Sequence, residues 1–444
     1  MSANRRIVRR HVAEPTGEWP SHWPDVLKRV HTARGSHGFD MAMPRLANLL
    51  PFTSLRGMEA AVDLLQSAIE RDARILIVGD FDCDGATATA VGVRGLRMLG
   101  ARNVLHAVPN RIVHGYGLTP GLVEELAALA PDLVVTVDHG IACHAGITAA
   151  KARGWQILVT DHHLPGPTLP PADAIVNPNQ PGDAFASKAL AGVGVIFYAL
   201  LALRARLGSK ADLPSLLDLV AVGTVADMVP LDANNRALVG AGLRRLRAGQ
   251  GCTGLHALIE VGGRKDATLT TSDIGFAIGP RLNAAGRLED MAIGIECLLS
   301  DDAGHARELA STLNDINAQR RALQSRMQDA ADTRIGDLDA SHGACMFDPD
   351  WHPGVVGLIA SKLKEKLHRP AIAFAPVEPG ASMLRGSARS IPGFHIRDAL
   401  ALVDSRHPGL IVRFGGHAMA AGLSLTREDF PAFRDAFDVV VGQT

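Results

Sequence analysis

The chain has 444 residues, enough for two or three domains and a large core. Hydrophobic residues make up 47% and charged residues 20%, which is typical of an ordinary globular protein. The net charge of −1 excludes a whole-molecule attraction to nucleic acid, so any such contact must use a local basic patch. Aromatic residues make up only 4%, which argues against an extended base-stacking platform.

Cysteine usage and apolar runs indicate the compartment. The five cysteines lack CxxC spacing, which argues against a zinc site and a disulfide scaffold, and we therefore expect a cytoplasmic protein in a reducing environment. The basic N-terminus is not followed by an apolar segment, so no signal peptide is expected. The longest apolar run, 189–203, contains glycines and is short for a membrane span, which predicts a buried helix.

Continuous apolar strands alternate with helices in the first part of the chain. The predicted strands are 74–80, 104–108, 133–138 and 157–161, and the predicted helices are 86–99, 123–129 and 145–153. Apolar runs of this kind indicate a parallel sheet covered by helices on both faces. Because the crossovers of such sheets are right-handed, the carboxyl ends of all the strands should open on one edge.

Residues 189–335 are predicted to be mostly helical. They end in a charged segment from 303 to about 334 that is either a helical connector or a surface helix. A second α/β unit begins near residue 340, with predicted strands at 344–347, 371–375, 382–388 and 410–414 and a predicted helix at 355–367. The predicted fold class is therefore α/β, with a parallel-sheet domain followed by a smaller α/β domain.

Three of the four strands predicted in the first part of the chain end in aspartate. They run into Asp80-Phe81-Asp82-Cys83-Asp84-Gly85, Asp138-His139-Gly140 and Asp161-His162-His163. Alternate residues of an extended chain point the same way, so Asp80, Asp82 and Asp84 are expected to converge. Gly85 is expected to permit a sharp turn into the next helix. Three converging carboxylates repel each other unless a cation neutralises them.

A metal site and a structural role compete for these acids. An aspartate between a strand and a helix also occurs as an N-cap, and a histidine pair also occurs on surfaces or in cores. An N-cap needs one acid, whereas three alternate here within one turn. Mixed carboxylate and imidazole ligands suit Mn²⁺ or Mg²⁺, and two such ions can bind a scissile phosphate and activate water. Asp227, in an apolar segment, is a further candidate ligand or a helix-terminal residue.

These motifs, in this order, resemble the DHH phosphoesterase superfamily, which is named after the triplet at 161–163. The match is closer to its RecJ family of bacterial single-strand DNA exonucleases. The motifs of the first half are DxDxDG at 80–85, VDxG at 137–140 and the segment 224–231, and those of the second half are RLNAAGRL at 281–288, WHPGVVG at 351–357 and FGGH at 414–417. The resemblance extends from about residue 35 to about residue 425, and the ordered set is far more specific than the triplet alone.

The resemblance implies two α/β domains joined by a long helix, with DNA in the cleft between them. It implies removal of mononucleotides from the 5′ end of single-stranded DNA, in repair and recombination, with two Mn²⁺ or Mg²⁺ ions. The implied metal ligands are Asp80, Asp82, Asp84, Asp138, His162 and Asp227. His163 is similar to the residue that contacts the scissile phosphate, and with Asp161 it forms the implied catalytic pair.

The implied substrate residues lie in both halves of the chain. Arg111, Ser387 and Arg389 resemble a pocket for the terminal 5′ phosphate, which two arginines and a serine can hold through charge-assisted bonds. His417 resembles a substrate-phosphate ligand. The glycines at 415–416 either let backbone amides approach a phosphate or form a tight strand-to-helix turn.

Further residues have two interpretations each. Arg281, Asn283 and Arg287 either track the DNA backbone or make buried structural pairs. Tyr116 lies between two glycines and either stacks on a base or packs within its loop. Cys83 stands where family members usually have a small residue, and we expect it to be tolerated because it should face away from the metals.

The resemblance divides the chain into four parts. These are an N-terminal arm (1–40), a DHH catalytic domain (41–235), a helical connector (236–335) and a DHH-associated substrate-binding domain (336–444). Family members usually continue into an OB-fold, which is absent before Thr444, so we expect weak binding of long strands. Single-stranded DNA is the implied partner, single-strand-binding protein and helicases are candidate partners, and no membrane contact is expected.

Three rival functions remain open. A DHH phosphodiesterase for short oligonucleotides or cyclic dinucleotides shares the DHH and GGH motifs, although the DxDxDG and RLNAAGRL motifs favour the RecJ type. An inactive replication scaffold should have lost metal-binding acids, and none is missing. A metalloenzyme that acts on a substrate without phosphate leaves Ser387 and Arg389 unexplained.

Overall fold

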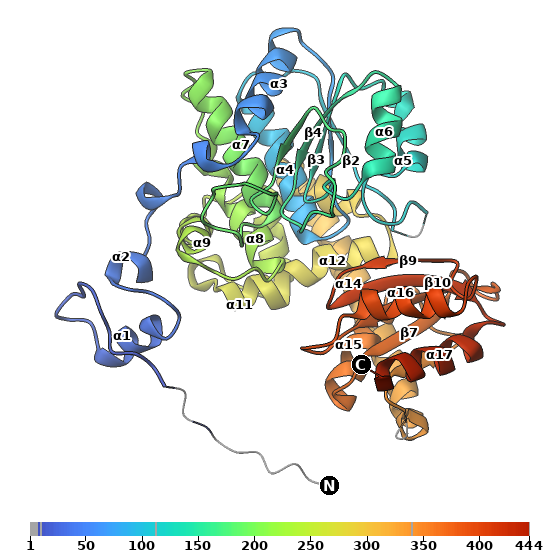
Figure 1. The fold of residues 1–444 in the computed structure, drawn as a ribbon. Helices are drawn as coiled ribbons and strands as arrows, with labels where there is room; N and C mark the ends of the chain where they lie inside the picture. Colours follow the sequence, from blue (N-terminus) through green and yellow to red (C-terminus); the bar gives the residue numbers. More distant parts are fainter. Residues whose placement is uncertain (1–7, 9–10, 112, 339–340, 444) are drawn as a thin grey trace. The chain divides into compact units, whose positions relative to one another are not determined.

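The computed structural model describes residue 8 and residues 11–111, 113–338 and 341–443 (Figure 1). The chain forms two compact units. The first comprises the described residues up to Gly286 together with Asp290–Leu313, and the second comprises Arg287–Glu289 and the described residues from Asn314 onward. Part of the predicted N-terminal arm, including Arg5, Arg6, Arg9 and Arg10, lies outside the described residues. The four-part division made from the sequence stays a prediction.

The first unit contains a five-stranded parallel sheet. Its strands are β1 (Ile75–Val78), β2 (Val104–Ala107), β3 (Leu133–Val137), β4 (Gln156–Thr160) and β5 (Ala174–Val176), in the order β2-β1-β3-β4-β5. The parallel sheet is confirmed. The sequence did not predict β5, because its three residues in a proline-rich stretch are too few to show a periodic pattern.

Helices cover both faces of this sheet, as predicted (Figure 1). Ile75, Ile77 and Val135 point to the face covered by α3 (Met58–Glu70), α4 (Cys83–Met98) and α7 (Gly192–Arg206). The alternating residues Leu76 and Val78 point to the face covered by α5 (Pro120–Leu126) and α6 (His144–Ala152). Because both faces are buried, the strands are apolar throughout.

The rest of the first unit is mainly helical, as the sequence predicts for 189–335, and its α-helical and π-helical elements follow in chain order. They are α1 (Asp25–Thr32), α2 (Phe39–Ala42), α8 (Leu217–Ala226), α9 (Ala233–Arg247), α10 (Thr253–Val261), α11 (Thr271–Asp273), a π-helical turn (Ile274–Ile278), α12 (Gly279–Leu288) and α13 (Ala292–Leu299). The charged segment forms one helix, α14 (Ala303–Thr333), and the boundary between the two units falls within it. The apolar run forms the buried helix α7, and no described helix has the length and apolar character needed to cross a bilayer.

The second unit contains a mixed five-stranded sheet. Its strands are β6 (Ala344–Phe347), β7 (Ala371–Pro376), β8 (Met383–Arg389), β9 (Arg413–Gly416) and β10 (Ala420–Thr426), in the order β6-β7-β8-β10-β9. Strands β6 and β7 are parallel and the other neighbours are antiparallel. The helices are α15 (Val356–Leu367), α16 (Ile396–Arg406) and α17 (Phe430–Gln443).

Two predictions for the second unit are wrong in detail. The strand predicted at 410–414 begins at Arg413 and includes both glycines of the GGH motif. These glycines lead through a short turn into β10, a strand that was not predicted, so the strand-to-helix turn considered for them is wrong. Only Leu423 and Leu425 mark the buried face of 420–426, because the third buried residue, Ala421, is flanked by the small residues Ala420 and Gly422.

Candidate active site

The carboxyl ends of three neighbouring strands bring buried acids to one edge of the first sheet. Asp138 follows β3 directly, Asp161 follows β4 directly, and Asp80 lies two residues beyond β1. All three side chains are buried, with 4% exposure or less. Because the strands are parallel and adjacent in the sheet, these acids share the edge at which open α/β sheets bind ligands. The predicted acidic edge is therefore present.

The loop after β1 differs from the extended chain expected from the sequence. Asp82 is the N-cap of α4, and its carboxylate accepts a hydrogen bond from the Gly85 amide at 3.0 Å. The helix begins at Cys83, so Asp84 lies in the first helical turn. The predicted alternation of three acids along an extended chain is wrong, because capping starts the helix three residues earlier than expected.

Gly85 also has a different role from the predicted sharp turn. It lies within α4 and has no positive φ angle. A Cβ atom at this position would lie 2.5 Å from the Asp80 carbonyl oxygen and 2.6 Å from the Asp80 amide nitrogen. The glycine therefore lets the helix approach the backbone of the acidic loop, which a larger residue would push apart.

Asp84 reaches a second helix. Its carboxylate accepts hydrogen bonds from the amides of Gly192 at 2.7 Å and Val193 at 3.0 Å, at the start of α7. A carboxylate at the amino end of a helix is stabilised by the helix dipole. The side chain is thus fixed beside the acidic edge by a segment more than 100 residues away in the sequence.

The candidate metal ligands form overlapping sets of three, whose ligand atoms lie within 4.8 Å of one another. The sets found among the described residues are Asp80 with Asp82 and Asp138, Asp84 with His162 and Asp227, and Asp138 with His162 and His163. The first two sets share no member, and the third bridges them. All six predicted ligands are therefore brought together, in an arrangement that offers separate ligand sets to two cations. Asp227 is also the C-cap of α8, so its two interpretations are compatible.

Hydrogen bonding and pKa shifts show that a cation fits these ligands. Asp138 Oδ1 and His162 Nε2 lie 3.1 Å apart, are buried, and have no hydrogen-bond partner among the described residues. Burial and the neighbouring Asp82 raise the pKa of Asp80 to about 8. Burial and nearby acids also raise the pKa of Asp138 well above its usual range. A bound divalent cation would coordinate these two atoms and keep the carboxylates ionised.

Asp138 occupies a backbone conformation that few residues adopt. Its φ angle is 65°, in the left-handed region that aspartate and asparagine tolerate better than most residues. A Cβ atom on Gly192 would lie 2.3 Å from Asp138 Oδ1. The start of α7 therefore closes against the candidate ligand, and the glycine at this position is needed for the approach.

The pair predicted to be catalytic is connected by a short hydrogen bond. His163 Nδ1 lies 2.8 Å from Asp161 Oδ1, and Asp161 also accepts from the amides of His162, His163 and Ile141. Burial lowers the pKa of His163, but the hydrogen bond and charge of Asp161 outweigh it and raise the pKa to about 9. Both carboxylate oxygens of Asp161 accept hydrogen bonds within the protein, so Asp161 acts as a positioning residue. The His163 side chain is partly exposed and can reach a substrate.

Replacing Asp161 by asparagine should lower kcat about 10- to 100-fold, the usual cost of removing an outer partner of a catalytic group. The amide has one acceptor oxygen where the carboxylate uses two, so the ring and the loop lose part of their support. Steady-state kinetics together with metal titration measures this effect. A variant with unchanged kcat, or one whose loss of activity is restored by excess metal, would show that Asp161 does not position His163.

The sequence did not reveal two asparagines that support the histidine pair. Asn177 Nδ2 donates to the His163 carbonyl at 2.9 Å, and Asn179 Nδ2 donates to the His162 carbonyl at 2.6 Å. Both follow β5 in a segment rich in asparagine and proline. Such a composition indicates only a turn, so nothing in the sequence connected these residues with the site.

Arg111 and Tyr116 lie against the acidic loop. The guanidinium carbon of Arg111 is 3.9 Å from the ring centroid of Phe81, within the range of a cation–π contact. The Tyr116 ring meets the Phe81 ring edge-on at 6.0 Å, and Tyr116 is 43% exposed. Loop packing is therefore present at Tyr116, and stacking on a base stays a prediction.

The RLNAAGRL segment contacts the loop after β1 through Asn283 and helix α10 through Arg281. Asn283 Oδ1 accepts from the Cys83 amide at 2.8 Å, and Arg281 Nη2 donates to the Val261 carbonyl at 3.3 Å. Both contacts agree with the structural interpretation of these residues. Their predicted contact with the DNA backbone stays a prediction.

The remaining predicted residues lie in the second unit. Arg389 Nη1 donates to Ser387 Oγ at 3.0 Å, and both residues project from β8. His417 is exposed in the turn between β9 and β10, where its amide donates to the Ala420 carbonyl at 2.8 Å. Ser387 and Arg389 are thus close together, and the phosphate-binding role of all three residues stays a prediction.

Comparison with known proteins identifies the family. A model of the DHH family, N-terminal domain, matches residues 74–224, and a model of the DHHA1 domain matches residues 341–443. A single-stranded-DNA-specific exonuclease RecJ of Dickeya dadantii is 50% identical over 458 aligned residues, which cover 100% of this chain and 79% of that protein. The chain belongs to the RecJ family.

Solved structures of RecJ proteins share the fold. A structure of exonuclease RecJ bound to manganese matches with a TM-score of 0.77 at 37% identity, covering 89% of this chain and 97% of that chain. A structure of RecJ from Thermus thermophilus in complex with Mg²⁺ matches with a TM-score of 0.74 at 32% identity, covering 94% of this chain and 57% of that chain. The resemblance inferred from the motifs and the α/β fold class are confirmed.

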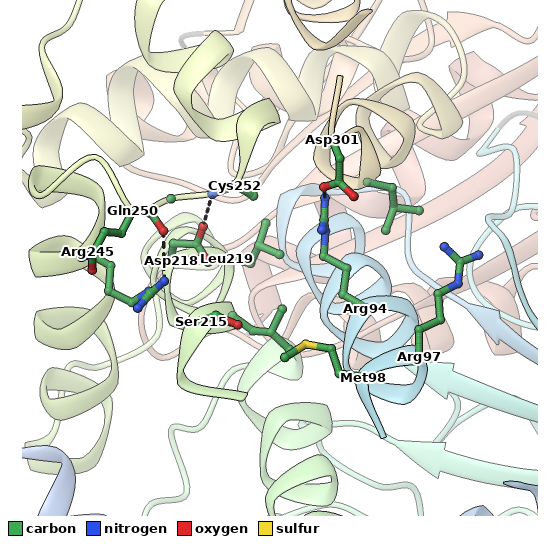
Figure 2. Close-up of a pocket in the computed structure, with 13 residues that line it drawn as sticks. Arg94, Arg97, Met98, Ser215, Asp218, Leu219, Arg245, Gln250, Cys252 and Asp301 are labelled. Carbon is green, nitrogen blue, oxygen red and sulfur yellow. Dashed lines mark hydrogen bonds and ion pairs between the residues drawn. The ribbon is translucent and has the colours of Figure 1, made fainter. Parts of the chain in front are cut away.

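A hollow of about 390 Å³ in this RecJ-family chain is lined by Arg94, Asp218 and Asp301, among other residues (Figure 2). Arg94, which lines it, is ten residues from Asp84 along α4, or about 15 Å at the rise of a helix. Arg94 pairs with Asp301 at 2.7 Å, and Asp218 accepts from the Cys252 amide at 2.6 Å. These internal contacts account for the charges, so the hollow is not part of the candidate site.

Proposed function

We propose that this chain is a metal-dependent exonuclease that hydrolyses single-stranded DNA from the 5′ end and releases mononucleotides, in DNA repair and recombination. The observation that carries the proposal is the pair of separate three-ligand sets, bridged by Asp138 and His162, at the strand ends of a RecJ-family chain. The donors are carboxylates and imidazole without thiolate, which suits Mn²⁺ or Mg²⁺.

The residues of the site divide the chemistry between them. Two bound cations would neutralise the scissile phosphate and supply the activated water. His163, whose pKa is raised by Asp161 to about 9, would donate a hydrogen bond to a phosphate oxygen. Burial of Asp80, Asp84 and Asp138 fixes the positions of these three ligands.

We assign the 5′ polarity to Arg111, Ser387 and Arg389, which would hold the terminal phosphate. A 5′-phosphorylated strand should then be degraded faster than a 5′-hydroxyl strand. Arg389→Ala should reduce that preference about 10- to 100-fold, the effect of losing one charged hydrogen bond worth about 1.5–3 kcal/mol. Rates on the two strands measure the preference for each variant.

Arg406→Ala is the control for this comparison, because Arg406 lies on α16 and bonds to Gln443. It should leave the preference for the 5′ phosphate intact. Degradation from the 3′ end, or equal rates on the two strands for the unmodified enzyme, would contradict the assignment.

The rival function is a phosphodiesterase for short oligonucleotides or cyclic dinucleotides. Comparing kcat/KM on a long single strand and on a dinucleotide separates the two, since an exonuclease gains binding energy from each further phosphate. A higher value on the dinucleotide would favour the rival.

The proposal includes a cellular setting. DNA repair and recombination take place where the chromosome lies, so we assign the enzyme to the cytoplasm of a bacterial cell. Its proposed partners are single-strand-binding protein, which covers single strands, and helicases, which generate them. Co-purification of these proteins with the chain tests this part of the proposal.

A further inference from the structure

Helix α15 packs on one face of the second sheet at β7 and β8, and this face is exposed at β10 and β9. Leu384, Ala388, Leu423 and Leu425 are buried on the opposite face, in the core that contains α16 and α17. The alternating residues of β8, β10 and β9 therefore share the first face, which we call the open face: Arg385, Ser387, Arg389, Ala420, Gly422, Ser424, Arg413 and Gly415. Ala420, Gly422, Arg413 and Gly415 are exposed.

Strand register arranges the open face in rows. Gly422 pairs with Ser387 on one side and Gly415 on the other, which makes one row of small residues across three strands. A Cβ atom on Gly415 would meet nothing within 4 Å. At Gly422 and Gly415 the row is thus low and flat, and the polypeptide backbone there is accessible to a ligand, whereas Ser387 lies beside Gly357 of α15.

A row of arginines runs beside it. Ser424 pairs with Arg385 on one side and Arg413 on the other. This row lies two residues, or about 7 Å, along the strands from the row of small residues. The two arginines stand at its ends, with Cα atoms about 10 Å apart across three strands.

The open face is strongly basic in a chain of net charge −1. The three strands β8, β9 and β10 contain three arginines and no acidic residue. Burial and the charge of Arg413 lower the pKa of Arg385, so the two guanidinium groups influence each other. Two guanidinium groups on one face of a sheet can both hold an anion through charge-assisted hydrogen bonds.

We propose that Arg385 and Arg413 bind a second phosphate of the DNA strand, distinct from the group assigned to Ser387 and Arg389. This inference rests on the proposed function. Guanidinium groups match the oxygen geometry of a phosphate, and the adjacent flat row leaves space for the sugar. Phe414, the one aromatic residue of the three strands, packs into the opposite core, so contact is with the backbone and independent of base sequence.

Kinetics of Arg413→Gln in the full chain test this assignment. Arg413 is exposed, so the variant should fold normally, as a thermal melt can verify. KM for a 5′-phosphorylated single strand of about 12 nucleotides should rise about 10-fold, with little change in kcat, because the contact persists through the reaction. The slope of log KM against log salt concentration should fall by about 0.7, the value for one lost phosphate contact on a single strand.

Strands with one neutral methylphosphonate linkage identify the phosphate. When the neutral linkage replaces the phosphate that Arg413 contacts, KM of the wild-type enzyme should rise by the same factor of about 10. On that strand, the wild-type enzyme and Arg413→Gln should have equal KM values. Arg385→Lys, which keeps the charge but loses the guanidinium fork, should show a smaller defect at the same linkage. The control is Arg397→Gln, an exposed arginine on α16, on the other face of the sheet, which should match the wild type.

Each outcome decides the inference. Equal KM values for Arg413→Gln and Arg397→Gln, or a defect that no single linkage removes, would overturn the second phosphate site while leaving the exonuclease function intact. A wild-type enzyme that fails to cleave the unmodified strand would instead refute the proposed function.

Discussion

Asp138→Asn is expected to abolish hydrolysis, with kcat/KM reduced at least about 1,000-fold, or about 4 kcal/mol. Asp138 belongs to both the first ligand set and the bridging set, so losing its charge should weaken cation binding at both sets. Asparagine is the informative replacement because it tolerates the φ angle of 65° at this position, whereas alanine would add backbone strain.

The same variant should unfold at an equal or higher temperature in metal-free buffer. Burial and the neighbouring acids Asp84, Asp82 and Asp80 raise the pKa of Asp138, and removing one of these clustered charges relieves their repulsion. Asp72→Asn is a matched control, because Asp72 is exposed and also has a left-handed φ angle, of 52°. Near-normal hydrolysis by Asp138→Asn would remove the basis of the metal site.

Gly192→Ala is expected to lower kcat about 100-fold without removing any charged group. The new methyl group would lie 2.3 Å from Asp138 Oδ1, whereas ordinary contacts begin near 3.4 Å, so the carboxylate or the helix must move by about 1 Å. Misplacement by about 1 Å commonly costs about 100-fold in rate. Steady-state kinetics with Mn²⁺ over a range of concentrations measures both kcat and the apparent affinity for the metal.

Gly121→Ala provides the comparison for this steric test. Gly121 lies in α5, and a Cβ atom there would meet nothing within 4 Å, so activity should stay normal and stability should rise slightly. If Gly192→Ala matches Gly121→Ala in activity, the start of α7 does not constrain Asp138.

The acidic edge could be predicted because it depends on a simple pattern. Buried parallel strands are apolar throughout, and their carboxyl ends meet at one edge, so acids at the ends of β1, β3 and β4 must approach each other. The backbone conformation of the loop after β1 was harder to predict from the sequence. Asp82 was placed in an extended chain, although a residue that can cap a helix before a helix-forming segment is also the expected start of that helix.

Long-range contacts account for what the sequence did not show. Gly192 and Asn177 have no local feature that connects them with the metal ligands, and only the folded chain brings them to Asp138 and His163. The row of Arg385 and Arg413 depends on the register of β8, β10 and β9, and β10 was not predicted at all. Register is fixed by which face is buried, which periodicity alone does not reveal in strands of small residues.

Digestion of 5′-phosphorylated, end-labelled single-stranded DNA, with Mn²⁺, Mg²⁺ or excess chelator, tests the central claim most directly. A label at the 5′ end should be released first, as a mononucleotide, with either metal, and no product should form with chelator. Hydrolysis in excess chelator, or release that begins at the 3′ end, would contradict it.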